Sequence, residues 1–111
     1  MATYDEAHIS RTEDKGTVTV TGAGALTYLN AEEFGISLKE ASVNSDDVVV
    51  DLNNANFIDT QIVQDLGRAA ITLLKRGKRL RVTISETAYP LRVLKISGYE
   101  SIMDIEAESS K

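Results

Sequence analysis

The sequence predicts an α/β fold. Three observations lead to this prediction: β-branched segments that alternate apolar and polar residues, longer segments whose apolar residues repeat at helical spacing, and regular alternation of the two after an opening hairpin. This order predicts a mixed sheet with helices packed on it. The expected elements are strands over 4–12 and 17–21, a helix over 31–42, a strand over 48–52, a helix over 60–75, a strand over 79–84, a helix ending at Gly98, and a short strand or helix over 102–105.

The first part of the chain is expected to form the hairpin and the first helix. Residues 4–12 have the pattern of a weak edge strand, and the polar turn 13–16 ends in glycine, as hairpin turns often do. Residues 17–21 alternate between threonine and valine, which predicts a strand with one apolar face. The Gly-Ala-Gly segment at 22–24 is expected to end that strand. Asn30 can cap the next helix, whose apolar stripe consists of Ala31, Phe34, Leu38 and Ala41.

The centre of the chain is expected to supply a buried strand and the longest helix. Residues 48–50 are three consecutive valines, apolar on both faces, and the run ends in Asp51-Leu52, which is typical of a central strand. Residues 53–56 are expected to form a loop, after which Phe57-Ile58 returns to the core. A helix then runs from Asp59-Thr60 to about Lys75. Its apolar positions form a broad stripe suited to packing on a sheet: Ile62, Val63, Leu66, Ala69, Ala70, Leu73 and Leu74.

The last part of the chain repeats the alternation. Gly77 suits the position just after a helix, and residues 79–84 alternate as a half-buried strand. Ser85 or Thr87 can cap a third helix, in whose first turn Pro90 is tolerated. Length and the lack of a linker predict one domain over residues 1–111, with a core of about 4–105.

Composition narrows the classes of function. The net charge of −5 argues against broad binding to nucleic acid or anionic membranes. Cysteine is absent, which excludes disulfides and thiolate metal sites. The polar N-terminus resembles no secretory signal, and no apolar run is long enough to span a bilayer, so we expect a cytoplasmic protein.

No catalytic constellation emerges from the sequence. His8 and Ser10 lie near each other on an expected edge strand, without a nucleophile elbow or a positioned acid. The adjacent carboxylates at 32–33 and 46–47 point apart on a helix or strand. The segment 22–24 lacks the third glycine of a dinucleotide loop. We therefore expect a binding module with no catalytic residue, metal or cofactor.

The most informative local segment is Asp59-Thr60. Either side chain can accept a hydrogen bond from the unpaired N–H groups at the helix start, which makes the segment an ordinary N-cap. Alternatively, Thr60 is an exposed phosphate acceptor. A phosphate brings about −1.5 to −2 charges, which the helix dipole tolerates but the nearby Asp59 and Asp51 resist.

Four segments, in matching order and spacing, resemble the STAS family of anti-sigma factor antagonists and stressosome proteins. The strand that ends in Asp51-Leu52, followed by residues 57–60, is similar to the family's strand, Asp-Leu, then aromatic-Met/Ile-Asp-Ser/Thr segment. Residues 24–31, 77–80 and 91–99 resemble three further family segments. The resemblance covers about residues 18–105. It implies an α/β, STAS-like mixed sheet of four to five strands with helices packed on it.

The resemblance also implies a function. In the family's antagonists, the serine or threonine after the motif Asp is phosphorylated by a partner anti-sigma factor kinase, and a phosphatase reverses this. That position here is Thr60. The implied function is an anti-sigma factor antagonist-like switch, a monomer or weak dimer, whose partners are a serine/threonine kinase anti-sigma factor and a protein phosphatase. No cofactor is implied, because the ATP belongs to the kinase. The alternative is a stressosome-type scaffold subunit that self-assembles and sequesters a kinase.

Two positions depart from the family's pattern. The usual Asp-Ser-Ser-Gly is here Asp59-Thr60-Gln61-Ile62, and Thr27 stands where the family usually has Asp. The Asp-Thr-x-Ile form is similar to stressosome STAS domains, and it is also compatible with a phosphorylation-independent antagonist. The expected partner-binding residues are Asn53, Asn54, Asn56, Asp59, Gln61, Gln64 and Arg68, with Asp51 and Thr27 near the phosphorylation site Thr60.

Overall fold

The computed structural model describes residues 7–86 and 88–108. These residues form six strands, three α-helices and one short 3₁₀ helix. In chain order they are β1 (His8–Asp14), β2 (Thr17–Leu26), α1 (Ala31–Asn44), β3 (Asp47–Asp51), β4 (Ala55–Ile58), α2 (Thr60–Lys75), β5 (Leu80–Ser85), α3 (Tyr89–Ser97), η1 (Tyr99–Ser101) and β6 (Met103–Glu108). The predicted α/β class is confirmed. Residues 4–6 of the expected first strand lie outside the described residues.

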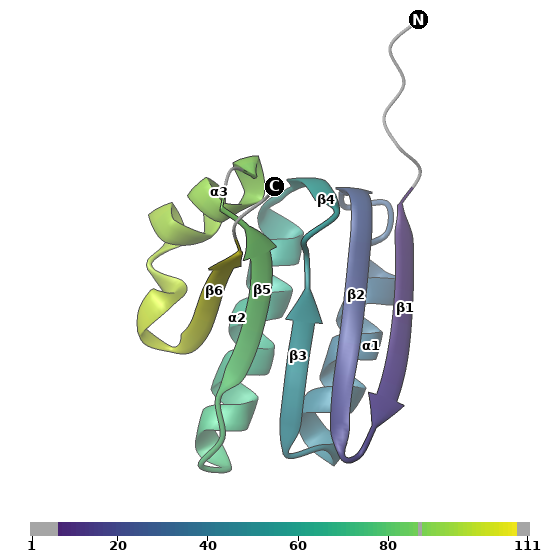
Figure 1. Cartoon of the computed structure of the whole chain (residues 1–111), viewed down its shortest axis with the longest axis vertical. Helices are drawn as coiled ribbons and strands as arrows, with labels where there is room; N and C mark the ends of the chain where they lie inside the picture. Colours follow the sequence, from purple (N-terminus) through teal and green to yellow (C-terminus); the bar gives the residue numbers. More distant parts are fainter. Residues whose placement is uncertain (1–6, 87, 109–111) are drawn as a thin grey trace, which may run out of the picture.

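The strands form one mixed sheet in the order β1-β2-β3-β5-β6, with β4 paired to β2 beyond the end of β3 (Figure 1). The hairpin β1–β2 is antiparallel, and the other pairings are parallel. Residues 55–58 were expected to be partly loop. They instead pair with the last residues of β2, so the described sheet has six strands where four to five were expected.

The sheet is covered by helices on one face. In Figure 1, α1 and α2 lie behind the sheet, and α3 lies beside its β5–β6 end. Strands β2, β3 and β5 alternate between buried and half-buried residues, and their buried side chains face the helices. The largest fully buried side chains gather between these layers: Phe34, Leu26, Leu38, Leu52, Ile58, Ile62, Leu66, Leu73, Leu80, Ile84, Leu94 and Met103.

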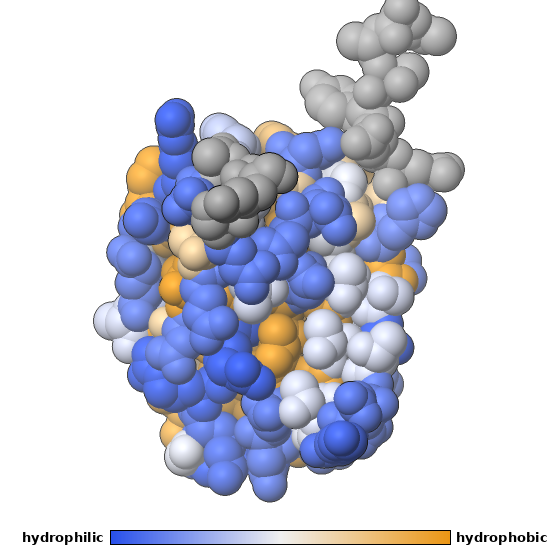
Figure 2. Space-filling view, viewed as in Figure 1, coloured by the Kyte–Doolittle hydropathy of each residue, from blue (hydrophilic) through white to orange (hydrophobic). Residues whose placement is uncertain are grey.

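No described helix covers the opposite face, which is the one turned to the viewer in Figures 1 and 2. By the alternation of β2 and β3, this face carries half-buried threonines from β2 and the half-buried Val49 from β3. The centre of the face is white to orange in Figure 2. The Asp47 carboxylate accepts hydrogen bonds from Thr17 Oγ1 at 2.6 Å and from Arg81 Nη2 at 2.9 Å. These two bonds hold the pKa of Asp47 below its usual value.

The Gly-Ala-Gly segment at 22–24 does not end β2, contrary to the sequence-based expectation. The strand continues to Leu26 because a second parallel partner, β4, takes over where β3 ends. A register shift lies between Gly24 and Ala25, and Gly24 has φ of +80°, which favours glycine. A Cβ at Gly22 would lie 2.7 Å from Leu26 Cδ1. Both glycines therefore serve the continuing strand.

Two helix starts differ from expectation. Asn30 occupies the N-cap position of α1, but its side chain makes no capping bond. Its Oδ1 instead accepts from Thr27 N at 3.0 Å, which closes the loop before the helix. For α3, Ser85 belongs to β5 and Ala88 is the N-cap, so the cap expected from Ser85 is wrong, while Thr87 lies outside the described residues. Pro90 lies in the first turn of α3, as expected.

Arg76 ties the ends of the two central helices together. Its Nη1 donates to Ser42 O and Ser45 O, each at 2.7 Å, and its Nη2 donates to Asp46 Oδ1 at 2.7 Å. Arg76 follows α2 as its C-cap residue and satisfies carbonyls at the end of α1. This anchor holds α1 and α2 side by side on the sheet. None of the described helices combines the length and apolar character that crossing a membrane requires.

Candidate functional site

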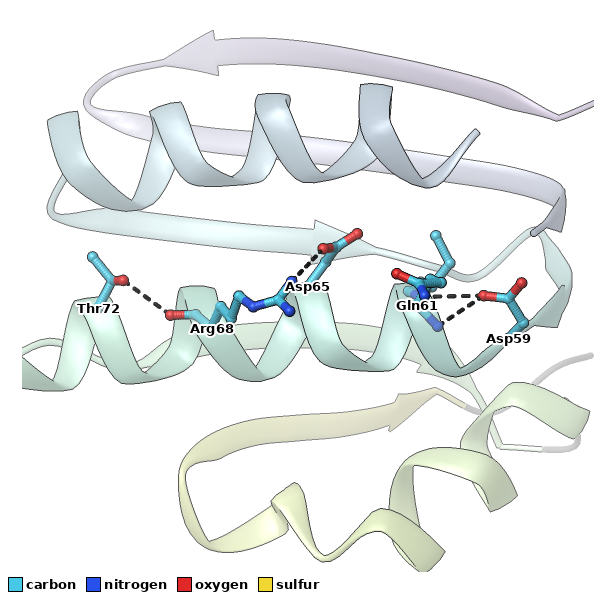
Figure 3. Close-up of polar contacts among 6 residues, drawn as sticks. Asp59, Gln61, Asp65, Arg68 and Thr72 are labelled. Atoms are coloured by element: carbon cyan, nitrogen blue, oxygen red, sulfur yellow. Dashed lines mark hydrogen bonds and ion pairs between the residues drawn. The ribbon is translucent and has the colours of Figure 1, made fainter. Parts of the chain in front are cut away.

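Asp59 and Thr60 lie at the junction between β4 and α2. Asp59 has an extended backbone, and its N–H donates to Leu26 O at 3.2 Å, which fixes the junction to the end of β2. Asp59 Oδ1 accepts from Gln61 N at 3.0 Å and from Ile62 N at 3.4 Å (Figure 3). Asp59 is therefore the N-cap, while Thr60 is the first helical residue and is exposed.

Polar side chains continue from this junction along α2. Gln61 and Gln64 are exposed in the first turns. One turn further, Arg68 Nη1 lies 3.3 Å from Asp65 Oδ1, and Thr72 Oγ1 donates to Arg68 O at 2.9 Å (Figure 3). In Figure 3, Asp65 points toward α1. The structure thus places Gln61, Gln64 and Arg68 on one helix, with Asp59 as its N-cap residue.

Asp51 and Asn53 belong to a different network. Asp51 Oδ1 accepts from Asn53 N and Asn53 Nδ2, each at 3.0 Å. Asn53 Nδ2 also donates to Glu108 Oε1 at 2.9 Å and to Thr83 Oγ1 at 3.4 Å. These bonds connect the turn after β3 with β5 and β6. They do not involve Asp59 or Thr60, so the expected site residues fall into two groups.

The remaining expected residues lie in the loops beside the helix start. Thr27 follows Leu26, the residue that holds Asp59 N, and Thr27 Oγ1 accepts from Leu29 N at 3.2 Å. Asn54 is exposed, and its carbonyl accepts from Gly24 N at 2.9 Å. Asn56 is also exposed, within β4. Thr27 is thus next to the junction, and its hydroxyl shapes the loop.

Sequence reasoning missed the exposed apolar side chains in the loop after β2. Tyr28 is 70 % exposed and Leu29 is 79 % exposed, both in the loop after β2. Phe57 stacks on Tyr89, with ring centroids 6.1 Å apart and an interplanar angle of 4°. Large apolar residues in a polar loop are the signal that could have revealed Tyr28 and Leu29. We call Thr27, Tyr28, Leu29, Asp59 and Thr60 the helix-start surface.

Asp65 is the titratable group of α2 whose environment is most unusual. Its side chain is only 14 % exposed. Burial raises the pKa of Asp65, the Arg68 guanidinium lowers it, and the Asp59 charge raises it. Within residues 7–86 and 88–108, no group of three or more His, Cys, Asp or Glu could hold a metal ion.

The fold and the sequence can be compared with known proteins. An anti-sigma factor antagonist from Mycobacterium paratuberculosis has a TM-score of 0.82 and 15% identity, over 97% of this chain and 92% of that chain. The Bacillus cell fate determinant SpoIIAA in its phosphorylated form has a TM-score of 0.64 and 17% identity, over 93% of each chain. At such identities the likeness shows the fold.

The search of curated proteins found no match. A protein-family model described as Mlab, STAS domain matches residues 8–104, which is most of the chain and nearly all of the described residues. The match includes both strands of the hairpin, the Asp59-Thr60 junction and the whole of α2. This chain belongs to the STAS domain family.

Proposed function

We propose that this chain is an anti-sigma factor antagonist-like switch. It binds a serine/threonine kinase anti-sigma factor through the helix-start surface, phosphorylation at Thr60 controls binding, and a protein phosphatase reverses the modification. The observation that carries the proposal is that Asp59, and not Thr60, caps α2 at the junction. Asp59 satisfies the N–H groups of Gln61 and Ile62, which leaves the exposed Thr60 at the first helical position without a capping task.

Phosphorylation would change this surface strongly. A phosphate on Thr60 adds about −1.5 to −2 charges next to the carboxylate of Asp59. The loop after β2, whose Leu26 is bonded to Asp59 N, carries the exposed apolar Tyr28 and Leu29. The N-terminal end of α2 stabilises such a charge, so the fold tolerates both states. A partner that contacts the unmodified surface with apolar side chains meets a buried charge after modification, which weakens binding.

Other residues have supporting roles in the proposal. The proposed partner contact extends from the helix-start surface into the adjoining loop and along α2, through Asn53, Asn54, Asn56, Gln61, Gln64 and Arg68. Asp51 and Asn53 hold that loop through their bonds to Thr83 and Glu108. The protein acts by binding, in the cytoplasm, and carries no cofactor of its own.

Binding measurements with the host's serine/threonine kinase anti-sigma factor test the switch. Thr60→Glu is expected to lower affinity by at least about tenfold, because it places a charge in the contact. Thr60→Ala is expected to stay within about threefold of wild type. Thr12→Glu, which adds the same charge on the exposed edge strand β1, serves as the control. Equal binding by Thr60→Glu and Thr60→Ala would overturn the proposal.

Two further measurements examine the modification and the assembly. Mass spectrometry after incubation with the kinase and ATP is expected to find one phosphate on Thr60, and an unmodified Thr60 would leave only a phosphorylation-independent antagonist. Light scattering after size-exclusion chromatography is expected to show a monomer or a weak dimer. A large assembly would instead favour the scaffold function of stressosome-type STAS domains.

A further inference from the structure

A groove lies between α1 and α2, on the outer side of the helical layer. Its volume is about 590 Å³. Because the Arg76 bonds hold the two helices at their C-terminal ends, the groove is a feature of the packed layer. Its lining residues come from both helices: Ala31, Glu32, Gly35, Ile36, Lys39, Ser42, Asp65, Arg68, Ala69, Ile71 and Thr72.

The Asp65 carboxylate lines this groove with an unsatisfied oxygen. Asp65 Oδ2 is buried and has no hydrogen-bond partner, and it is the one such side-chain atom found among the described residues. Asp65 Oδ1 has a single contact at 3.3 Å, with Arg68 Nη1. A buried carboxylate oxygen without a donor is costly, so such atoms in native proteins call for an explanation.

Gly35 provides the space that the carboxylate occupies. A Cβ at this position would lie 3.2 Å from Cγ, Oδ1 and Oδ2 of Asp65. Glycine within a helix costs about 1 kcal/mol relative to alanine. The chain therefore combines an unfavourable helix residue in α1 with an unsatisfied carboxylate in α2, at the same place in the groove.

The lining combines aliphatic side chains with two cations, Lys39 and Arg68, and two carboxylates, Glu32 and Asp65. Ile36 is 52 % exposed and Ile71 is 46 % exposed, one on each helix. Arg68 is 71 % exposed and touches Asp65 through one nitrogen only, where a close arginine–carboxylate pair would use two. The groove thus offers exposed aliphatic side chains around a carboxylate that its own arginine satisfies incompletely.

We infer that this groove receives a lysine or arginine side chain of the partner protein. The methylene groups pack between Ile36 and Ile71, and an N–H donates to the Asp65 carboxylate, whose side chain is 14 % exposed. A basic side chain matches both features, because it joins an apolar stem to a charged donor. The inference rests on the proposed function for the identity of the partner, the kinase anti-sigma factor that also contacts Gln61 and Arg68 on the same helix.

A fragment experiment tests the chemistry of the groove without the partner. n-Butylguanidinium chloride is titrated into the ¹⁵N-labelled full chain, and the amide spectrum is followed by NMR. Saturable shifts are expected at Gly35, Ile36, Asp65 and Ala69. Asp65→Asn is expected to weaken binding at least fivefold. Asp104→Asn, which removes an exposed carboxylate paired with Arg79, is the matched control and is expected to bind like wild type.

A second probe separates charge from hydrogen bonding. n-Butyltrimethylammonium carries the same charge but has no N–H, and it is expected to bind at least fivefold more weakly than n-butylguanidinium. Equal binding of the two probes, or equal binding by Asp65→Asn and wild type, would overturn the inference. Shifts of the same amides on raising the concentration of probe-free protein would assign the groove to a second copy of the chain and would also overturn it.

The experiment distinguishes this inference from the proposed switch. Thr60→Glu is expected to bind n-butylguanidinium like wild type, because Thr60 does not line the groove. The double variant Thr60→Ala/Asp65→Asn is expected to bind the kinase at least fivefold more weakly than the single variant Thr60→Ala. Unchanged kinase binding there would refute the groove contact alone, whereas unchanged kinase binding by Thr60→Glu would refute the switch alone.

Discussion

At the scale of single residues, Asp59 and Thr60 perform different tasks although both could have capped α2. Asp59 has the extended backbone of an N-cap and holds two N–H groups, those of Gln61 and Ile62. Thr60 is the first helical residue and faces solvent. Stability and recognition at this junction can therefore be altered separately.

Removing the cap is expected to reduce stability. Asp59→Ala should lower the free energy of unfolding by about 1 kcal/mol, because two N–H groups at the start of α2 lose their acceptor. Asp59→Asn keeps an acceptor oxygen and should cost only a few tenths of that amount. Urea denaturation checks both variants, and an equal loss in the two would show that Asp59 acts mainly through its charge.

Asp65 gives the stability a dependence on pH. Burial raises the pKa of Asp65 in the folded protein above its usual 3.8. Between these two values the folded state binds more protons than the unfolded state, so the contribution of Asp65 to the free energy of unfolding falls as pH rises. Above the raised pKa the loss is complete.

Asp65→Asn is expected to remove this loss. Its free energy of unfolding, measured relative to wild type, should increase from about pH 4 to about pH 7, because only wild type must ionise a buried carboxyl. Urea denaturation at several pH values provides the test. Asp104→Asn controls for the change in net charge. A difference between Asp65→Asn and wild type that stays constant across this range would contradict the assignment.

At the scale of elements, α2 packs closely against its neighbours at two glycines, one in α2 and one in α1. A Cβ at Gly67 would lie 2.7 Å from Cζ of Tyr99, the first residue of η1. The ring of Tyr99 therefore packs directly onto the α2 backbone. On the other side of α2, Asp65 meets Gly35 of α1. The two glycines set how closely α1 and η1 approach the central helix.

Gly67→Ala is expected to destabilise the protein, although alanine is the better helix former by about 1 kcal/mol. The new Cβ overlaps the Tyr99 ring, and such overpacking typically costs about 1–3 kcal/mol. Thermal and urea denaturation measure the effect. The double variant Gly67→Ala/Tyr99→Ala should lose less than the sum of the two single variants. Additive losses would show that the ring moves aside without cost.

At the scale of the whole molecule, the helices and the sheet form two layers, and one face of the sheet is left uncovered by the described helices. Neighbouring residues in β3 therefore have different surroundings. Val50 is completely buried against the helices, whereas Val49 is half-buried on the threonine-rich face. This contrast offers a direct test of the architecture.

Threonine has nearly the shape of valine, so it reports on polarity alone. Val50→Thr buries a hydroxyl and should lower the free energy of unfolding by about 1–3 kcal/mol. Val49→Thr should change it by less than about 0.5 kcal/mol, because it matches neighbouring half-buried threonines. Urea denaturation compares the two. Similar losses at both positions would mean that the outer face is covered in solution.

The sequence by itself determined the features that arise from local order. The Thr/Val alternation at 17–21, the β-branched run at 48–50 and the apolar stripe of α2 each predict an element from local pattern alone. Asp59 as a cap follows from the same local chemistry. The order of these elements then sufficed to predict a mixed α/β sheet, and the STAS resemblance agreed with it.

Only the tertiary structure decided the features that depend on contacts between distant segments. The passage of β2 through Gly22 and Gly24 depends on β4, which follows some thirty residues later. The position of the Asp65 carboxylate depends on Gly35 in another helix. One of the Asn53 hydrogen bonds depends on Glu108, which is distant in the sequence. Periodicity indicates which face of a segment is buried but not which residues that face contacts. The features above depend on particular neighbours, which the chain brings together only on folding.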